Sequence, residues 1–211
     1  MKRILFMVLR NLIFVPYGWF KLCYYARHVE KYTEEERYAM LKYIDRRANW
    51  GGRITIDAHG VEPCPRPFSV VMKKEVANVP FLKQVFACMK AIALDREDVR
   101  QAMRVMLEVA EEVKKGRAYL IFPEGTRSKM GNRLLDFKGG SFKCAMKAKC
   151  PIVPVALIDS YKSFDTNSIE KLTVQVHYLK PLMYEEYKDM KSTEIAALVK
   201  KRIEDTIEQY E

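Results

Sequence analysis

The sequence lacks the cysteine pattern of a disulfide framework or a structural zinc site. Of its 211 residues only five are cysteine, an odd number, and none stands in a Cys-x-x-Cys pair. Only three histidines are present, and none has metal-ligand spacing to a cysteine. These absences predict reduced thiols in a cytosolic setting. We therefore expect neither a metal nor a cofactor.

The sequence also lacks an uninterrupted apolar run long enough to cross a membrane. Residues 4–20 are mostly apolar, but Arg10 and Asn11 interrupt them and Pro16 breaks them, whereas a spanning helix needs about 20 apolar residues. A signal peptide is disfavoured because no small-x-small cleavage site follows the basic start. Aromatic and basic side chains follow instead, as is typical of the headgroup zone. We predict that residues 1–27 form a helix in the membrane interface, with an ordinary core helix as the alternative.

Acidic residues are too few to balance the basic ones. Lysine and arginine number 37 against 27 aspartates and glutamates, which gives a net charge of +10. This excess predicts an anionic partner: nucleic acid, an anionic membrane surface or a phosphorylated substrate. A nucleic-acid-binding domain is disfavoured because the positive charge is spread along the chain and no helix-turn-helix, RNP or zinc pattern is present. We therefore expect membrane lipid, and no nucleic acid, as a partner.

Hydrophobic periodicity predicts an α/β fold with a largely parallel mixed sheet flanked by helices. A capping box, with Thr33 and Glu36 as its partners, opens a predicted helix, and Asp98 caps another. Of the five strands listed next, the first is predicted to be half-buried and the third to be buried on both faces. The predicted strands cover residues 53–59, 68–72, 118–122, 152–157 and 172–178, and the predicted helices cover residues 33–48, 98–115 and 193–209. We assign residues 1–48 to a helical membrane-association segment and residues 49–211 to one α/β domain.

The strongest local motif is FPEGTRS at residues 122–128, directly after a predicted strand. Open α/β sheets place their ligand sites at the carboxyl ends of strands. Pro123 ends the strand because it has no N–H for the ladder, and Gly125 permits a tight turn close to a ligand. Arg127 offers a planar fork that matches phosphate oxygens. The motif predicts a phosphate site, with a polar turn and a solvated arginine as the alternative.

The other motif residues supply polar groups to the same turn. The hydroxyls of Thr126 and Ser128 are hydrogen-bond donors. Glu124, beside an arginine, is expected to be ionised and to fix the arginine side chain.

The motif resembles the most recognisable motif of the glycerophospholipid acyltransferase family, the 1-acylglycerol-3-phosphate acyltransferases. Three weaker blocks follow the same family order. They are KEVANVP at residues 74–80 leading to LDR at 94–96, FKGGSF at 137–142 and PIVPV at 151–155. The resemblance covers about residues 68–157, although Lys83 and Lys90 stand where the family often has glycine.

The resemblance implies an activity and a site. A fatty acyl group would pass from a thioester of acyl-carrier protein or coenzyme A to the free hydroxyl of a lysophosphatidate, making phosphatidate at the cytoplasmic face of the membrane. The chain would be a peripheral or monotopic membrane protein at that face. The motif residues 124–128 would hold the acceptor's phosphate, and Lys74 and Arg96 would add positive charge near it. Plain surface charge is the alternative for these last two residues.

The sequence departs from the family at the catalytic base. The resemblance implies a His-x-x-x-x-Asp motif, but the residues five positions after His28, His59 and His177 are not aspartate. Family-like sequence stops at Glu62 and resumes at Pro65, with only two residues between them. We therefore expect the native protein to carry the catalytic histidine and aspartate between Glu62 and Pro65.

Two other interpretations remain open. If the chain truly lacks this pair, a non-catalytic phospholipid-binding homologue of the same fold is favoured. His59 lies on the same strand face as Asp57, and their spacing allows contact. A polar-face histidine is nevertheless the favoured interpretation of His59.

Overall fold

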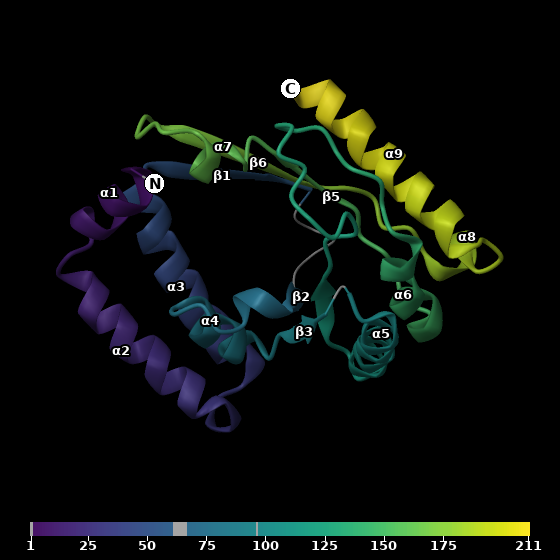
Figure 1. Ribbon diagram of the computed structural model, residues 1–211, viewed down its shortest axis with the longest axis horizontal. Coiled ribbons are helices and arrows are strands. Elements are labelled where there is room, and N and C mark those ends of the chain that lie inside the picture. Colours follow the sequence, from purple (N-terminus) through teal and green to yellow (C-terminus); the bar gives the residue numbers. More distant parts are fainter. Residues whose placement is uncertain (1, 61–66, 96) are drawn as a thin grey trace.

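Strands and helices alternate along the chain in the computed structural model, which describes residues 2–60, 67–95 and 97–211 (Figure 1). The strands are β1 (Ile54–His59), β2 (Phe68–Lys73), β3 (Ile92–Leu94), β4 (Ala118–Leu120), β5 (Val155–Ile158) and β6 (Leu172–Tyr178). The helices are α1 (Lys2–Arg10), α2 (Phe14–Arg27), α3 (Glu34–Gly52), α4 (Leu82–Met89), α5 (Val99–Lys114), α6 (Lys143–Ala148), α7 (Lys162–Asp165), α8 (Tyr184–Tyr187) and α9 (Ser192–Tyr210). Short 3₁₀ turns are η1 (Val29–Lys31), η2 (Lys74–Val76) and η3 (Gly139–Phe142).

The strands form two separate three-stranded sheets rather than the single sheet that we predicted. In the first sheet, ordered β1-β6-β5, β1 pairs with β6 in parallel over six residues and β5 runs antiparallel to β6. The second sheet, ordered β3-β2-β4, is entirely parallel. Figure 1 shows the two sheets as distinct groups of strands. The α/β prediction is therefore confirmed, but the described residues contain no strand that joins the two groups.

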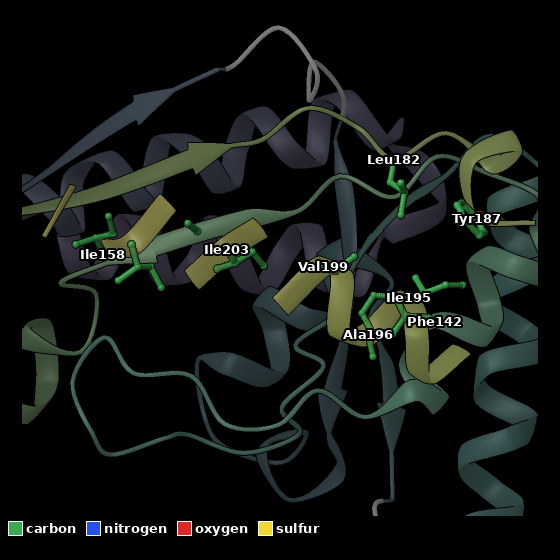
Figure 2. Packing of buried hydrophobic residues seen from close by; sticks show 10 residues of the cluster. Phe142, Ile158, Leu182, Tyr187, Ile195, Ala196, Val199 and Ile203 are labelled. Carbon is green, nitrogen blue, oxygen red and sulfur yellow. The ribbon is translucent and has the colours of Figure 1, made fainter. Parts of the chain in front are cut away.

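The largest core cluster lies between α9 and the first sheet. Figure 1 shows α9, in yellow, along β5, and Figure 2 shows its apolar side chains pointing into the cluster. Ile195, Val199, Ile203 and Ile207 repeat at helical spacing and are all buried, as the sequence predicts. The hydroxyl of Tyr187 donates to the Ala145 carbonyl at 3.2 Å, so this deep tyrosine has its polar end satisfied.

The N-terminal segment forms two helices, α1 and α2, bent by 95°, instead of the predicted single helix. Pro16 explains the break: it has no N–H to donate to the Leu12 carbonyl, so a helix cannot run through it, yet it fits in the first turn of α2. No single helix in the described ranges is long and apolar enough to cross a bilayer, but the bent pair passes that test together.

Both N-terminal helices are packed against the rest of the molecule. The buried Arg3 side chain donates to the carbonyl of Gly52 at 2.6 Å and to that of Glu170 at 2.9 Å. Leu22 is fully buried in a cluster with Met40 on α3 and Cys88 on α4. Removing residues 1–27 would therefore expose core surface, so this segment contributes to the fold.

Two strands are less buried than their sequences predict. From its second residue onward β1 is exposed, and Ile56 keeps 47% of its surface accessible, so the half-buried prediction is wrong. β4 is half-buried rather than buried on both faces, and Phe122 just beyond it is 51% exposed. Both are edge strands of their sheets, and these two apolar side chains remain exposed among the described residues.

Candidate functional site

The motif of residues 122–128 forms a tight turn immediately after β4. The ladder of β4 already ends at Leu120, so the prediction that Pro123 ends the strand is wrong. The N–H of Gly125 donates to the Phe122 carbonyl at 3.1 Å. Gly125 has a φ of +75°, a conformation that side chains other than glycine's rarely adopt. Because β3, β2 and β4 are parallel, this turn lies at the carboxyl edge of their sheet, where such folds bind ligands.

Two hydrogen bonds fasten the chain beyond the turn back onto it. The N–H of Lys138 donates to the Pro123 carbonyl at 2.9 Å. The N–H of Leu135 donates to Oε2 of Glu124 at 2.8 Å. The prediction that Glu124 fixes Arg127 is therefore wrong: its carboxylate holds the loop backbone instead.

Asp165 is the partner of Arg127. Nη2 of Arg127 donates to Oδ1 of this aspartate at the end of α7. The arginine side chain is 65% exposed, so it remains accessible to a ligand. Only one of its nitrogens is engaged in this contact, and the remaining donors stay available. Sequence reasoning missed Asp165, because nothing in the chain signals a contact between segments so far apart.

Lys138 lies directly over the turn. Its Nζ is 3.1 Å and its Cε 3.3 Å from the place that a Cβ on Gly125 would occupy. The lysine belongs to the FKGGSF block, which carried the family resemblance but no assigned role. Of the other motif residues, Thr126 is exposed, and the hydroxyl of Ser128 accepts from the Met130 N–H at 3.3 Å.

Lys74 lies at the same carboxyl edge, after β2. Its Nζ is 2.9 Å from Oδ2 of Asp95, which follows β3. This hydrogen bond raises the pKa of Lys74 and lowers the pKa of Asp95, so both groups are held charged. No hydrogen bond or ion pair joins Lys74 to residues 122–128 within the described parts of the chain. Arg96, the other predicted cation, lies outside the described residues.

A histidine pair lies on the first sheet, where β1 and β6 run side by side. The rings of His59 and His177 stack with centroids 4.6 Å apart, and Tyr210 covers His177 at 4.3 Å. Nε2 of His59 is 3.1 Å from Oδ2 of Asp57, which confirms that their spacing allows contact. Nε2 of His177 lies 3.0 Å from Oε1 of Gln175.

The environment of this pair keeps His177 neutral. Burial lowers its pKa below the ordinary value, and the neighbouring His59 lowers it further, against an opposing effect of Asp57. His59 itself is about half exposed. Packing therefore explains the stacked pair, in which the His59 ring is partly exposed to solvent and the His177 ring is buried.

The predicted catalytic histidine and aspartate stay a prediction. The positions between Glu62 and Pro65 lie outside the described residues, and the sequence holds only Pro63 and Cys64 there. Two cavities, of about 410 and 320 Å³, lie elsewhere, and none of the predicted site residues lines them.

Comparison with known proteins gives a consistent result. The profile of the family described as "Acyltransferase" matches residues 54–158. A 1-acyl-sn-glycerol-3-phosphate acyltransferase from Escherichia coli is 31% identical over 182 residues, which are 86% of this chain and 72% of that protein. One of the same name from Cocos nucifera is 33% identical over 130 residues, but this chain spans only 42% of its length.

A solved structure supports the fold. The crystal structure of the 1-acyl-sn-glycerophosphate (LPA) acyltransferase PlsC from Thermotoga maritima superposes with a TM-score of 0.67. The match covers 96% of this chain and 97% of the other, at 19% sequence identity. The α/β architecture described above is therefore an established one.

The histidine pair predicts how stability depends on pH. The pKa of His177 is lowered on folding, so the unfolded chain binds the proton more readily, and the free energy of unfolding should fall as the pH drops below about 6.5. Replacing His177 with Gln should flatten this dependence between pH 7.5 and 5.5 in urea unfolding. An unchanged slope in the His177→Gln protein would contradict the assignment.

Proposed function

Because the chain belongs to the acyltransferase family that includes the 1-acyl-sn-glycerol-3-phosphate acyltransferases, we propose that it moves a fatty acyl group from an acyl thioester to a lysophosphatidate. The product is phosphatidate, an intermediate of phospholipid synthesis. Acyl-carrier protein or coenzyme A carries the thioester.

The observation that carries this proposal is the turn at residues 123–127. It combines an exposed guanidinium, the exposed side chain of Thr126 and a tight turn that Gly125 permits, at the carboxyl edge of a parallel sheet. These groups suit a phosphate monoester, because arginine binds two phosphate oxygens at once. Lys74 lies at the same edge, but its ion pair with Asp95 offsets its charge.

The chemical step needs a base in addition to the phosphate site. A histidine oriented by an aspartate takes the proton from the acceptor's hydroxyl, and the oxygen attacks the thioester carbonyl. The tetrahedral intermediate collapses, the ester forms, and the thiol leaves with the proton that the histidine returns. Asp57 and His59 have the required contact, but they lie on the other sheet and His59 stacks on a neighbouring ring.

The separation of the strands into two sheets supports the proposal that a segment is missing after Glu62. The two sheets are separate, and an apolar side chain is left exposed at an edge strand of each: Ile56 on β1 by 47% and Phe122 beyond β4 by 51%. Native α/β sheets cover such side chains. A strand and a helix start inserted between β1 and β2 would supply both the cover and the two catalytic residues.

We predict that the native gene encodes a histidine and an aspartate five residues apart between Glu62 and Pro65. Sequencing the gene tests this directly, and the intact mass of the native protein should exceed the 24.7 kDa of this chain. Replacing that histidine should abolish acyl transfer and leave lysophosphatidate binding largely intact, because the base acts only in the chemical step. An uninterrupted Glu62–Pro65 coding sequence would remove the enzyme proposal and leave the non-catalytic, phospholipid-binding homologue.

The role of Arg127 predicts a loss of activity on its removal. Arg127→Ala deletes a charge-assisted contact worth about 1.5–3 kcal/mol, which corresponds to roughly a tenfold to more than a hundredfold loss in kcat/KM. Arg127→Lys should recover only part of this, because an ammonium lacks the planar fork. Steady-state kinetics with a lysophosphatidate measures the effect, and Arg133→Ala on the same loop is the matched control. A near-normal kcat/KM in Arg127→Ala would exclude the residue from the site.

We also propose that α1 and α2 attach the chain to the membrane surface as a peripheral or monotopic protein. Apolar side chains on α1 and in the turn before α2 face outward although neighbouring residues are buried: Leu5 is 62%, Leu9 59% and Ile13 96% exposed. Arg3 and Leu22 meanwhile fix the helices to the domain. Apolar groups left in water on a packed element suit insertion into the headgroup boundary.

The membrane proposal predicts the effect of surface substitutions. Changing Leu5, Leu9 and Ile13 together to Ser should weaken binding to anionic vesicles at least about tenfold, because each buried CH₂ contributes about 0.8 kcal/mol. Vesicle sedimentation measures binding, and the melting temperature should hardly change because the three side chains are exposed. Val99→Ser, at a site 74% exposed but away from these helices, is the control. Unchanged binding by the triple variant would refute the interfacial helices.

A further inference from the structure

Lys138 lies beside Gly125, although the described residues show no ion pair or side-chain hydrogen bond that would hold it there. Its Nζ, Cε and Cδ lie 3.1, 3.3 and 3.5 Å from where a Cβ on Gly125 would be, so the whole end of the side chain runs along this glycine. Gly125 is therefore needed for two reasons: its positive φ and the space that the lysine fills. An ammonium group is thereby held beside the backbone of the turn.

The ammonium of Lys138 is unpaired within the described parts of the chain. Many other lysines in this protein contact a carboxylate, among them Lys74, Lys162 and Lys200. Lys138 has no ion pair and no side-chain hydrogen bond there, although Glu124 lies on the same turn. A charge held in place without a counter-ion is available to an anionic ligand.

The backbone around Lys138 is well fixed. Its N–H donates to the Pro123 carbonyl at 2.9 Å. Phe137, one residue earlier, packs against the core cluster of α9. A Cβ on Gly139, one residue later, would lie 3.1 Å from the Ser192 hydroxyl at the start of α9. The backbone of Lys138 is thus fixed, and its exposed side chain starts from a defined position beside the turn.

The side chains that contact the loop or the Arg127 guanidinium are acidic, which favours a further cation at the turn. Arg127 contributes one positive charge, whereas Glu124 and Asp165, which contact the loop and the guanidinium, contribute two negative charges. Without Lys138 this group is net negative, which disfavours a phosphate monoester carrying −1.5 to −2 charges at neutral pH. With Lys138 the four side chains are balanced before the ligand arrives.

We propose that Lys138 is the second cation of the phosphate site and contacts the acceptor's phosphate together with Arg127. This proposal rests on the proposed function, because it assigns a ligand to the same turn. It makes Lys138 a determinant of specificity for phosphate-bearing lysolipids over neutral ones. The hydroxyl chemistry and the acyl donor are not affected.

The test compares two ligands that differ only in the phosphate. Binding of a lysophosphatidate and of the monoacylglycerol with the same acyl chain is measured in neutral detergent micelles by calorimetry. Lys138→Met should lower the preference for the lysophosphatidate by about tenfold to a hundredfold, the range expected for a charged contact, and leave monoacylglycerol binding unchanged. Lys138→Arg should restore most of the preference, because it restores the charge.

Lys143→Met is the matched control. Lys143 lies five residues further on, is exposed, and has no ion pair in the described ranges, so its loss should not alter the preference. Thermal melting establishes that each variant is folded, and Lys138→Gln, which keeps a polar end, serves if the Met variant melts early. Combining Lys138→Met with Arg127→Ala should cost less than the sum of the single losses, as expected for two cations that share one ligand.

The outcomes separate the two proposals. Suppose that the unaltered chain prefers lysophosphatidate and that Arg127→Ala loses the preference. If Lys138→Met and Lys138→Gln then keep the preference within about twofold, Lys138 is not in the site and the proposed function stands. If the unaltered chain binds both ligands equally, the phosphate site itself is refuted, and the role of Lys138 with it. A loss confined to Lys138→Met, Lys138→Gln and Arg127→Ala supports both.

Discussion

The hydrogen bond from the Lys138 N–H to the Pro123 carbonyl is the interaction on which the candidate site depends. Pro123 lies beyond the end of β4, so its carbonyl has no ladder partner, and this bond both satisfies that carbonyl and returns the chain to the turn. It places the Lys138 side chain along Gly125 and, through Gly139, ties the turn to the start of α9. One backbone contact thereby connects the carboxyl edge of one sheet to the helix that covers the other.

Arg127 and Asp165 show how a weak interaction can serve binding. Exposed ion pairs contribute about 0.2–1 kcal/mol, whereas hydrogen bonds between a guanidinium and a phosphate are worth about 1.5–3 kcal/mol. Asp165 therefore limits the motion of the guanidinium without competing effectively against a phosphate. The aspartate engages one nitrogen and leaves the others free, so orientation and binding are compatible.

Local features of the fold were predictable from sequence, and long-range ones were not. The capping box at Thr33, the apolar face of α9 and the turn at Gly125 follow from residues close in sequence, and the structure has all three. The contact of Arg127 with Asp165 joins segments far apart, and the three-residue β3 is too short for a periodic pattern. The phosphate motif could be recognised because its residues are contiguous, whereas its supporting side chains are not.

The exposed state of β1 has a consequence for how the chain behaves in concentrated solution. Its outer edge has no partner among the described residues, and the side chains from Thr55 onward are accessible on both faces. Unpaired edges of this kind are templates for pairing with strands of other molecules. The net charge of +10 opposes such encounters by repulsion between the molecules. Salt screens this repulsion, and its range is only about 8 Å at physiological ionic strength. We therefore expect self-association of this 211-residue chain to increase with ionic strength, whereas its attraction to anionic lipid should decrease.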